Sequence, residues 1–193
     1  LRALLRNPQG ALGLILCSLV LFAAVFGPEI APKDPETFHF NARFAAPSLE
    51  FPLGADWYGR DLLSRILVGA RSTVLLALLA TFIGTAAGAV IGVLSGYLGG
   101  IVDEALMRLT DAIMAIPSLL FALMIIAVLG SSSINAVLAI GIAFAPGMAR
   151  IARSVTLQVR SLDYVAAAKA RGESLGWIVA AEILPNTIAP VIV

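Results

Sequence analysis

The sequence predicts an all-α integral membrane protein that crosses the bilayer several times. Of its 193 residues, 60% are apolar and only 13% are charged, which is about half the charged share of a typical soluble domain. Several uncharged stretches reach the roughly 20 residues that a membrane-spanning helix needs. The net charge is +1, so there is no electrostatic basis for a nucleic-acid partner.

The first predicted span covers residues 7–28, an uncharged run that Pro28 and Pro32 should end. Residues 1–31 are therefore assigned to the N-terminal end and this span. Residues 32–70 contain several prolines and aromatics, which indicates an ordered loop outside the membrane, since disordered segments are poor in aromatics. A separate amphipathic helix at 60–69, in which Asp61 faces Arg65, is expected to end this loop along the bilayer surface.

The second predicted span covers residues 72–102 and carries a regular set of glycines. They recur every four residues, at Gly84, Gly88, Gly92 and Gly96. This spacing places them on one stripe of the helix, where missing side chains let another helix approach closely. The alternative is that glycine is simply common in membrane helices.

The second half of the chain begins with a group of charged residues and returns to uncharged sequence. The group consists of Asp103, Glu104, Arg108 and Asp111. The uncharged run 112–149 is too long for one helix, and a turn at 130–135 is expected to divide it into a third span and a fourth, shortest one. Residues 186–193 would begin a fifth span, so we expect four complete spans plus a truncated fifth, either in a fragment of a longer protein or in a naturally truncated one.

The orientation follows from the distribution of lysine and arginine. With the N-terminus inside, eight of these residues lie on the cytoplasmic side and five on the outer side. The turn at 130–135 has none, which fits an outside position.

The loop at residues 158–186 is predicted to be a helix–glycine–helix element on the cytoplasmic surface. Ser161 or Asp163 is expected to cap a short alanine-rich helix, which Gly172 ends in a left-handed conformation. Ser174 is expected to cap a second helix, which Pro185 closes. A helix with little side-chain bulk suits a groove on another protein, and the alternative is an ordinary hairpin between spans.

This loop resembles the coupling loop of ABC importer permeases, whose pattern is Glu-Ala-Ala, three residues, Gly, about nine residues, then Ile-x-Leu-Pro. Ala167, Ala168, Gly172, Leu184 and Pro185 match it. Two positions depart: an alanine replaces the glutamate, and Glu-Ile stands where Ile-x is expected. The coupling residues that the resemblance implies are Tyr164, Ala166, Ala167, Ala168, Gly172, Ile183, Leu184 and Pro185.

Further motifs resemble the C-type subunit of dipeptide, oligopeptide and nickel permeases. They lie at residues 4–8, 30–35, 52–71 and 96–117. The resemblance implies the transmembrane domain of a type I ABC importer, in which six spans are expected, with residues 71–193 as its permease core. It further implies a bacterial inner-membrane protein that works with a second homologous permease, two cytoplasmic ATPase subunits, an extracytoplasmic solute-binding protein and membrane lipid.

The implied function is a pathway for di- or oligopeptides that opens by alternating access, with nickel or another small solute as an alternative cargo. ATP hydrolysis would belong to the partner subunits, so we expect no enzymatic activity, no catalytic residues and no cofactor in this chain. The sequence has no phosphate-binding Gly-rich loop ending in Lys-Ser/Thr. Its single histidine, His39, cannot by itself build a metal site.

The charged group at residues 103–111 and the class of membrane protein each allow more than one interpretation. Asp103, Arg108 and Asp111 either form a second cytoplasmic contact with the ATPase, form an internal lock, or belong to a solvated helix end with a local ion pair. A secondary transporter would need an inverted repeat or ion-binding residues near the midplane of the bilayer, and neither is found. A membrane scaffold without transport activity is the remaining alternative.

Overall fold

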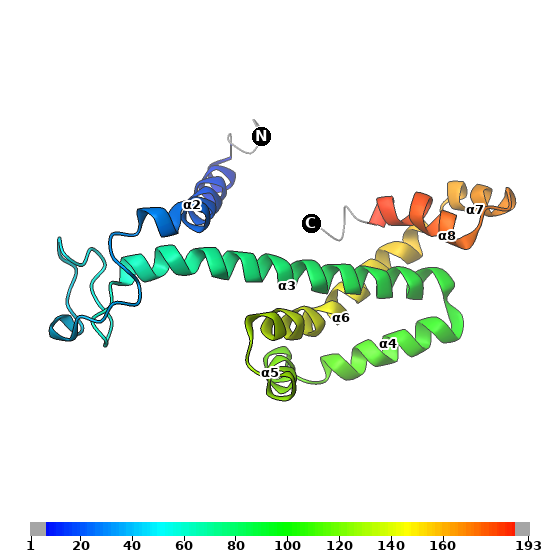
Figure 1. Ribbon diagram of the computed structural model, residues 1–193. Helices are drawn as coiled ribbons and strands as arrows, with labels where there is room; N and C mark the ends of the chain where they lie inside the picture. The colour runs from blue at the N-terminus through cyan, green and yellow to red at the C-terminus, as the bar shows by residue number, and fades with distance from the viewer. Residues whose placement is uncertain (1–6, 188–193) are drawn as a thin grey trace. The chain divides into compact units, whose positions relative to one another are not determined.

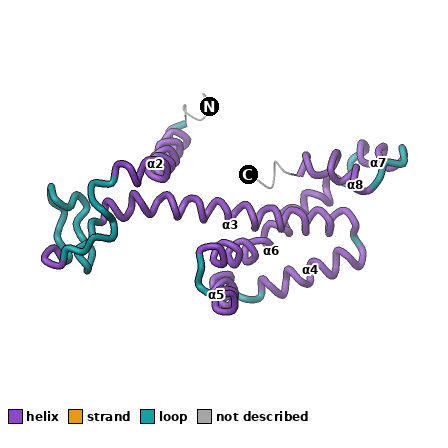
Figure 2. The backbone as a smooth tube through the Cα atoms, in the orientation of Figure 1, coloured by secondary structure: helices purple, strands orange, loops and turns teal. Residues whose placement is uncertain are grey.

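Helices make up the regular structure of residues 7–187, the part of the chain that the computed structural model describes. Figure 1 shows their order along the chain, and Figure 2 shows the long loop that joins α2 to α3. Within residues 7–187 no strand is formed, only an isolated bridge between Ala55 and Asp61. The chain divides into two units, one up to Leu76 and one from Ala77.

The first unit opens with helix α2 (Pro8–Ile30). The side chain of Asn7 accepts a hydrogen bond from the N–H of Gln9 at 3.1 Å, and Pro8 occupies the first turn, where its missing N–H costs nothing. Pro28 does not end this span as predicted, because the helix continues to Ile30; it stops before Pro32, the second proline that was expected to end it. A proline this close to a C-terminus removes one hydrogen bond, and the N–H of Ala31 still closes the last turn on the carbonyl of Gly27 at 3.0 Å.

The loop between α2 and α3 is ordered by short-range hydrogen bonds, with one short 3₁₀ turn, η1 (Phe40–Ala42). Asp56 accepts from the N–H groups of Tyr58 at 2.8 Å and Arg60 at 3.0 Å, and from Nε of Arg60 at 2.8 Å. Burial of Asp56 opposes ionisation, but the hydrogen bonds from Arg60 and Tyr58 outweigh it and hold the pKa of the carboxyl below its usual range.

Asp61 caps the helix that follows this loop. The Oδ2 atom of Asp61 accepts hydrogen bonds from the N–H of Ser64 at 2.9 Å and from the Ser64 hydroxyl at 2.6 Å. Asp61 is only 1% exposed. The expected pairing of Asp61 with Arg65 is therefore wrong, and Arg65 instead lies 3.9 Å from the carboxylate of Asp56. The capping geometry explains the difference, because it turns the Asp61 carboxylate toward the backbone of the first turn.

Helix α3 (Leu62–Leu98) is 37 residues long and runs without a break. The separate surface helix expected at 60–69 is therefore wrong, since those residues form the first turns of α3. Nothing between Leu62 and Leu98 prevents helix propagation, because the segment contains no proline, arginine is a good helix former and isolated glycines are tolerated. Gly99 and Gly100, with φ of +67° and +57°, end the helix before the expected residue 102.

The third predicted span is broken in the structure. Helix α4 (Gly100–Met114) contains the charged group, and helix α5 (Ser118–Leu129) leaves it at an angle of 90°. Pro117 precedes α5 and cannot donate the hydrogen bond that would continue α4. The bend thus lies at Pro117, where a residue without an N–H is expected to kink or trim a span.

Helix α6 (Ser133–Val159) is the fourth predicted span, and at 27 residues it is longer than α2, not the shortest. Pro146 lies inside it without ending it. Three helices of the described chain are long and apolar enough to cross a membrane, or four if α4 and α5 together form one span. The predicted fifth span falls almost entirely outside the described residues, so the predicted total of four complete spans and a truncated fifth is not confirmed.

Candidate functional site

The glycine stripe of α3 faces α6 at very short range. A Cβ added to Gly84 would lie 2.9 Å from the carbonyl oxygen of Gly141, and one added to Gly88 would lie 2.5 Å from that of Ala145. At Gly92 and Gly96 an added Cβ would approach α6 to 2.3 Å and 2.8 Å. All four positions therefore contact the same helix, and no larger side chain fits at this distance between the backbones.

The stripe ends in a cluster of ionic contacts. Both guanidinium nitrogens Nε and Nη2 of Arg153 on α6 lie 2.6 Å from the carboxylate oxygens of Asp103 on α4. The hydroxyl of Ser95 on α3 donates to the same carboxylate. Arg160, the C-cap residue that follows α6, donates from Nη1 to the carbonyl oxygen of Gly96 at 2.6 Å. Side chains of α3, α4 and α6 thus meet at the carboxylate of Asp103, and Arg160 adds a second bond between the end of α6 and α3.

The other charged residues of α4 make simpler pairs. Arg150 Nη2 lies 2.5 Å from Asp111 Oδ1, which again links α6 to α4. Arg108 pairs with Glu104 at 2.6 Å within α4, and both side chains are largely exposed. Of the predicted contact residues, Asp103 and Asp111 therefore pair with arginines of α6, while Arg108 belongs to a local, solvent-exposed ion pair.

The loop after α6 begins with helix α7 (Asp163–Ala170). Its N-cap is Leu162, which makes no side-chain bond, so the expected capping by Ser161 or Asp163 is wrong. The Ser161 hydroxyl instead donates to the carbonyl of Gln158 at 2.7 Å in the preceding turn. Gly172 adopts a φ of +79°, the left-handed conformation that glycine takes at low cost.

The second half of the loop consists of helix α8 (Leu175–Trp177) and the π-helical segment η2 (Ile178–Ile183). Ser174 caps it as expected, accepting from the N–H of Trp177 at 3.3 Å. The helix runs past Pro185 to residue 187, so the expectation that the proline closes it is wrong. In the wider π turn the N–H of Leu184 donates to the carbonyl five residues back, which accommodates a following residue without an N–H.

The loop has a buried face and an exposed face. Val165, Ala168, Ile178 and Ile183 pack with Val93 and Val159 in the hydrophobic cluster of the second unit. Of the predicted coupling residues, Ala168 and Ile183 are therefore fully covered by the chain itself. Those that remain exposed are Tyr164, Ala166, Ala167, Gly172, Leu184 and Pro185.

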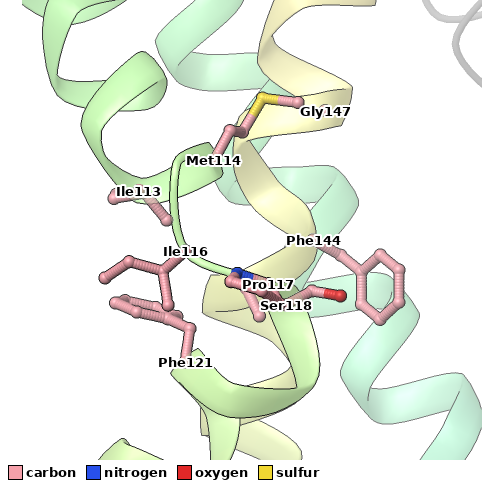
Figure 3. Close-up of a pocket in the computed structure, with 9 residues that line it drawn as sticks. Ile113, Met114, Ile116, Pro117, Ser118, Phe121, Phe144 and Gly147 are labelled. Carbon is pink, nitrogen blue, oxygen red and sulfur yellow. The ribbon is translucent and has the colours of Figure 1, made fainter.

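Sequence reasoning missed a cavity at the bend between α4 and α5 (Figure 3). Its volume is about 290 Å³, and its lining is mostly apolar. The lining residues are Ile113, Met114, Ile116, Pro117, Ser118, Phe121, Ala143, Phe144 and Gly147. Pro117 was the available signal, because irregular backbone at membrane depth occurs where it is buried in protein or lines a cavity.

Sequence reasoning also missed the arginines of α6 as site residues. Arg153 and Arg160 are seven positions apart, which places them two turns apart on one helix face. That spacing was visible in the sequence, but their partners on α3 and α4 were not. Within residues 7–187, no group of three or more His, Cys, Asp or Glu side chains is arranged to hold a metal ion.

Residues 88–193, more than half of the chain, match the family model described as "binding-protein-dependent transport system inner membrane component". This chain is a member of that family. Residues 1–47 of the permease also match the N-terminal transmembrane domain of oligopeptide transport permease C. The resemblance to the C-type subunit of peptide permeases is thus confirmed, and the protein is a multi-pass component of the inner membrane.

Several peptide permeases are similar to this permease over nearly its whole length. A probable D,D-dipeptide transport system permease protein of Escherichia coli K12 is 38% identical over 187 residues, which cover 97% of this chain and 63% of the relative. A dipeptide transport system permease protein of Haemophilus influenzae is 34% identical, with 97% and 66% covered. A di/tripeptide transport system permease protein of Pseudomonas aeruginosa is 38% identical, with 96% and 63% covered. The chain spans slightly less than two thirds of the length of these relatives.

Proposed function

We propose that this permease forms part of the pathway of an ATP-driven importer for di- or oligopeptides. The relatives named for dipeptides and for di/tripeptides support peptides as the cargo class. In this proposal the permease pairs with a second homologous permease in the membrane. Two ATPase subunits bind on the cytoplasmic side, and a solute-binding protein delivers the peptide from outside.

The observation that carries the proposal is the two-faced loop after α6. Its inner face is anchored through Val165 and Ala168, while Ala166 and Ala167 present only methyl groups to the outside. A small-residue surface on a firmly held helix lets a partner groove close tightly around it, with little side-chain entropy lost. We assign the exposed residues Tyr164, Ala166, Ala167, Gly172, Leu184 and Pro185 to the surface that contacts the ATPase.

The mechanism proposed is alternating access. When the ATPase subunits close on ATP, they displace α7, and the helices attached to it rock so that the pathway opens outward. Close backbone packing between α3 and α6 suits such movement, because packed interfaces shift between discrete arrangements and do not deform continuously. Residues 32–70 would lie on the outer side, near the solute-binding protein.

The test of the coupling surface is capture of the ATPase subunits by the detergent-solubilised permease. Ala167→Arg adds bulk and charge to an exposed position, so the permease should still fold while the partner groove is blocked. Ala46→Arg makes the same change at an exposed position of the loop between α2 and α3 and serves as the matched control. Gly172→Pro should also abolish capture, because proline cannot adopt a φ of +79°.

Loss of capture in Ala167→Arg and Gly172→Pro, with Ala46→Arg binding normally, supports the proposal. Normal capture by Ala167→Arg means that α7 does not enter a partner groove. The loop would then be only a connection between two spans, and the coupling assignment would be abandoned.

A further inference from the structure

The contacts of Arg153 and Arg160 join the start of the loop to the turn between α3 and α4. Arg153 binds Asp103, in the first turn of α4, through two hydrogen bonds of 2.6 Å. Arg160 donates to the carbonyl oxygens of Gly96 and Tyr97, at 2.6 Å and 3.3 Å, at the C-terminus of α3. The loop therefore starts from a point that is bonded to both helices of the α3–α4 turn.

A second attachment lies further along the loop. Val165 and Ala168 of α7 pack with Val93 of α3 in the hydrophobic cluster. The ammonium group of Lys169 lies 5.0 Å from the ring centroid of Tyr97, within the range of a cation–π interaction. The C-terminal end of α3 thus holds α7 in two ways: through the hydrogen bonds of Arg160, just before α7 begins, and through the apolar packing of the buried face of α7.

The turn itself provides little stiffness of its own. Gly99 and Gly100 both have positive φ, and the backbone hydrogen bonds at the turn, from Gly99 N–H to Ser95 and from Asp103 N–H to Gly99, only close the end of α3 and the start of α4. The hydroxyl of Ser95 reaches across the turn to Asp103, and Arg153 binds the other helix to it. Without the Asp103 carboxylate, the first turn of α4 would lose its side-chain bonds to α3 and α6, and only the more exposed Arg150–Asp111 pair further along α4 would still bond it to α6.

We propose that Asp103 and Arg153 are positioning residues for coupling, which make the end of α3, α4, the end of α6 and α7 move as one body. The inference rests on the proposed function, because it assigns a mechanical role in passing the movement of α7 on to the pathway. Displacement of α7 then carries α4 with it, and the motion is absorbed at the 90° bend between α4 and α5, where the cavity lies.

Burial and geometry separate this pair from the other ion pairs of α4. The side chains of Asp103 and Arg153 are 19% and 33% exposed, against 64% and 78% for Glu104 and Arg108. A partly buried, bidentate pair holds its partners in one geometry, whereas exposed pairs within a helix contribute little. Glu104→Gln is therefore a matched control on the neighbouring residue of the same helix.

The experiment measures import of a radiolabelled alanyl-alanine dipeptide per ATP hydrolysed, by the full chain reconstituted with its partner subunits in proteoliposomes. Asp103→Asn should leave ATP hydrolysis in place and lower the dipeptide imported per ATP by about tenfold, a typical coupling effect. Glu104→Gln should import at the parental ratio. The double variant Asp103→Asn with Arg153→Gln should be no worse than the single one, because the two residues act as one pair.

A second measurement reports on the rigid body without relying on transport. Spin labels are placed at the exposed positions Ala105 of α4 and Ala170 of α7, in a Cys17→Ser background. The distance distribution between the labels should be the same with and without a trapped nucleotide in the parent and in Glu104→Gln. In Asp103→Asn it should change or broaden between the two states.

The outcomes distinguish this inference from the function on which it rests. A parental complex without ATP-driven uptake would refute the proposed function, and the label distances would still decide whether the helices move together. Parental import per ATP in Asp103→Asn, or unchanged label distances in that variant, would overturn the positioning role. So would losses that add in the double variant, since they would show that the two residues act independently.

Discussion

Replacing Gly92 by alanine should weaken the packing of α3 on α6. The added Cβ would lie 2.3 Å from the carbonyl oxygen of Ala149 and 2.7 Å from the Cβ of Ala152. Non-bonded carbon contacts need about 3.5 Å or more, so the two backbones would have to separate by about 1 Å. Overpacking of this kind costs about 1–3 kcal/mol, and the better helix propensity of alanine returns about 1 kcal/mol. We expect a net loss of up to about 2 kcal/mol in the free energy of unfolding, and a stability about 1–3 kcal/mol below that of a variant that gains only the helix propensity of alanine.

The assay is reversible unfolding in mixed micelles, followed by circular dichroism. Gly69→Ala is the matched control in the same helix, because no atom lies within 4 Å of the Cβ that it would add. It should leave the free energy of unfolding unchanged or raise it by up to about 1 kcal/mol. Equal stability of the two variants would refute the reasoning, since it would mean that α3 and α6 do not meet along the glycine stripe.

Three further predictions follow from local contacts. The pKa of Asp56 is lowered in the folded loop, so the ionised carboxylate stabilises the loop above the unfolded pKa of about 3.9, and this stabilisation is lost as the pH falls through the folded pKa. The fluorescence of Trp57, measured in a Trp177→Phe background, should therefore show a transition at acid pH. Asp56→Asn should remove that transition. Gly27→Ala would bring a Cβ within 2.1 Å of a carbonyl oxygen on α3, and should destabilise the docking of α2 by about 1–3 kcal/mol in the same unfolding assay. Ser174→Ala removes an N-cap and should cost about 1 kcal/mol, seen as faster hydrogen exchange at the Trp177 amide, whereas Ser174→Asp should keep it slow.

The elements that could be predicted from sequence are those controlled by local rules. An apolar run of sufficient length forms α2 because backbone groups in lipid must be paired within the helix. The helical repeat of 3.6 residues brings Gly84 to Gly96 onto one face. Gly172 and Ser174 end and begin helices through their own conformational preferences, and the structure shows both in those roles.

Prediction failed where proline and charge were read as boundaries. Pro28 and Pro185 were expected to end helices but lie inside them, because a neighbouring turn or a wider π turn compensates for the single lost hydrogen bond. Arg65 was read as part of a separate surface helix, although arginine continues a helix readily and α3 passes through it.

The sequence by itself determined that this protein is a helical membrane component with a close-packing glycine stripe and a helix–glycine–helix loop, because length, periodicity and backbone preference are encoded within a few turns. Only the tertiary structure decided which partner each charged group takes. Asp103 binds an arginine 50 residues away, and that choice depends on how closely α3 admits α6. It also decided that Ala168 faces inward while Ala167 faces outward, because the side of α7 that is buried depends on helices that lie far from it in the sequence.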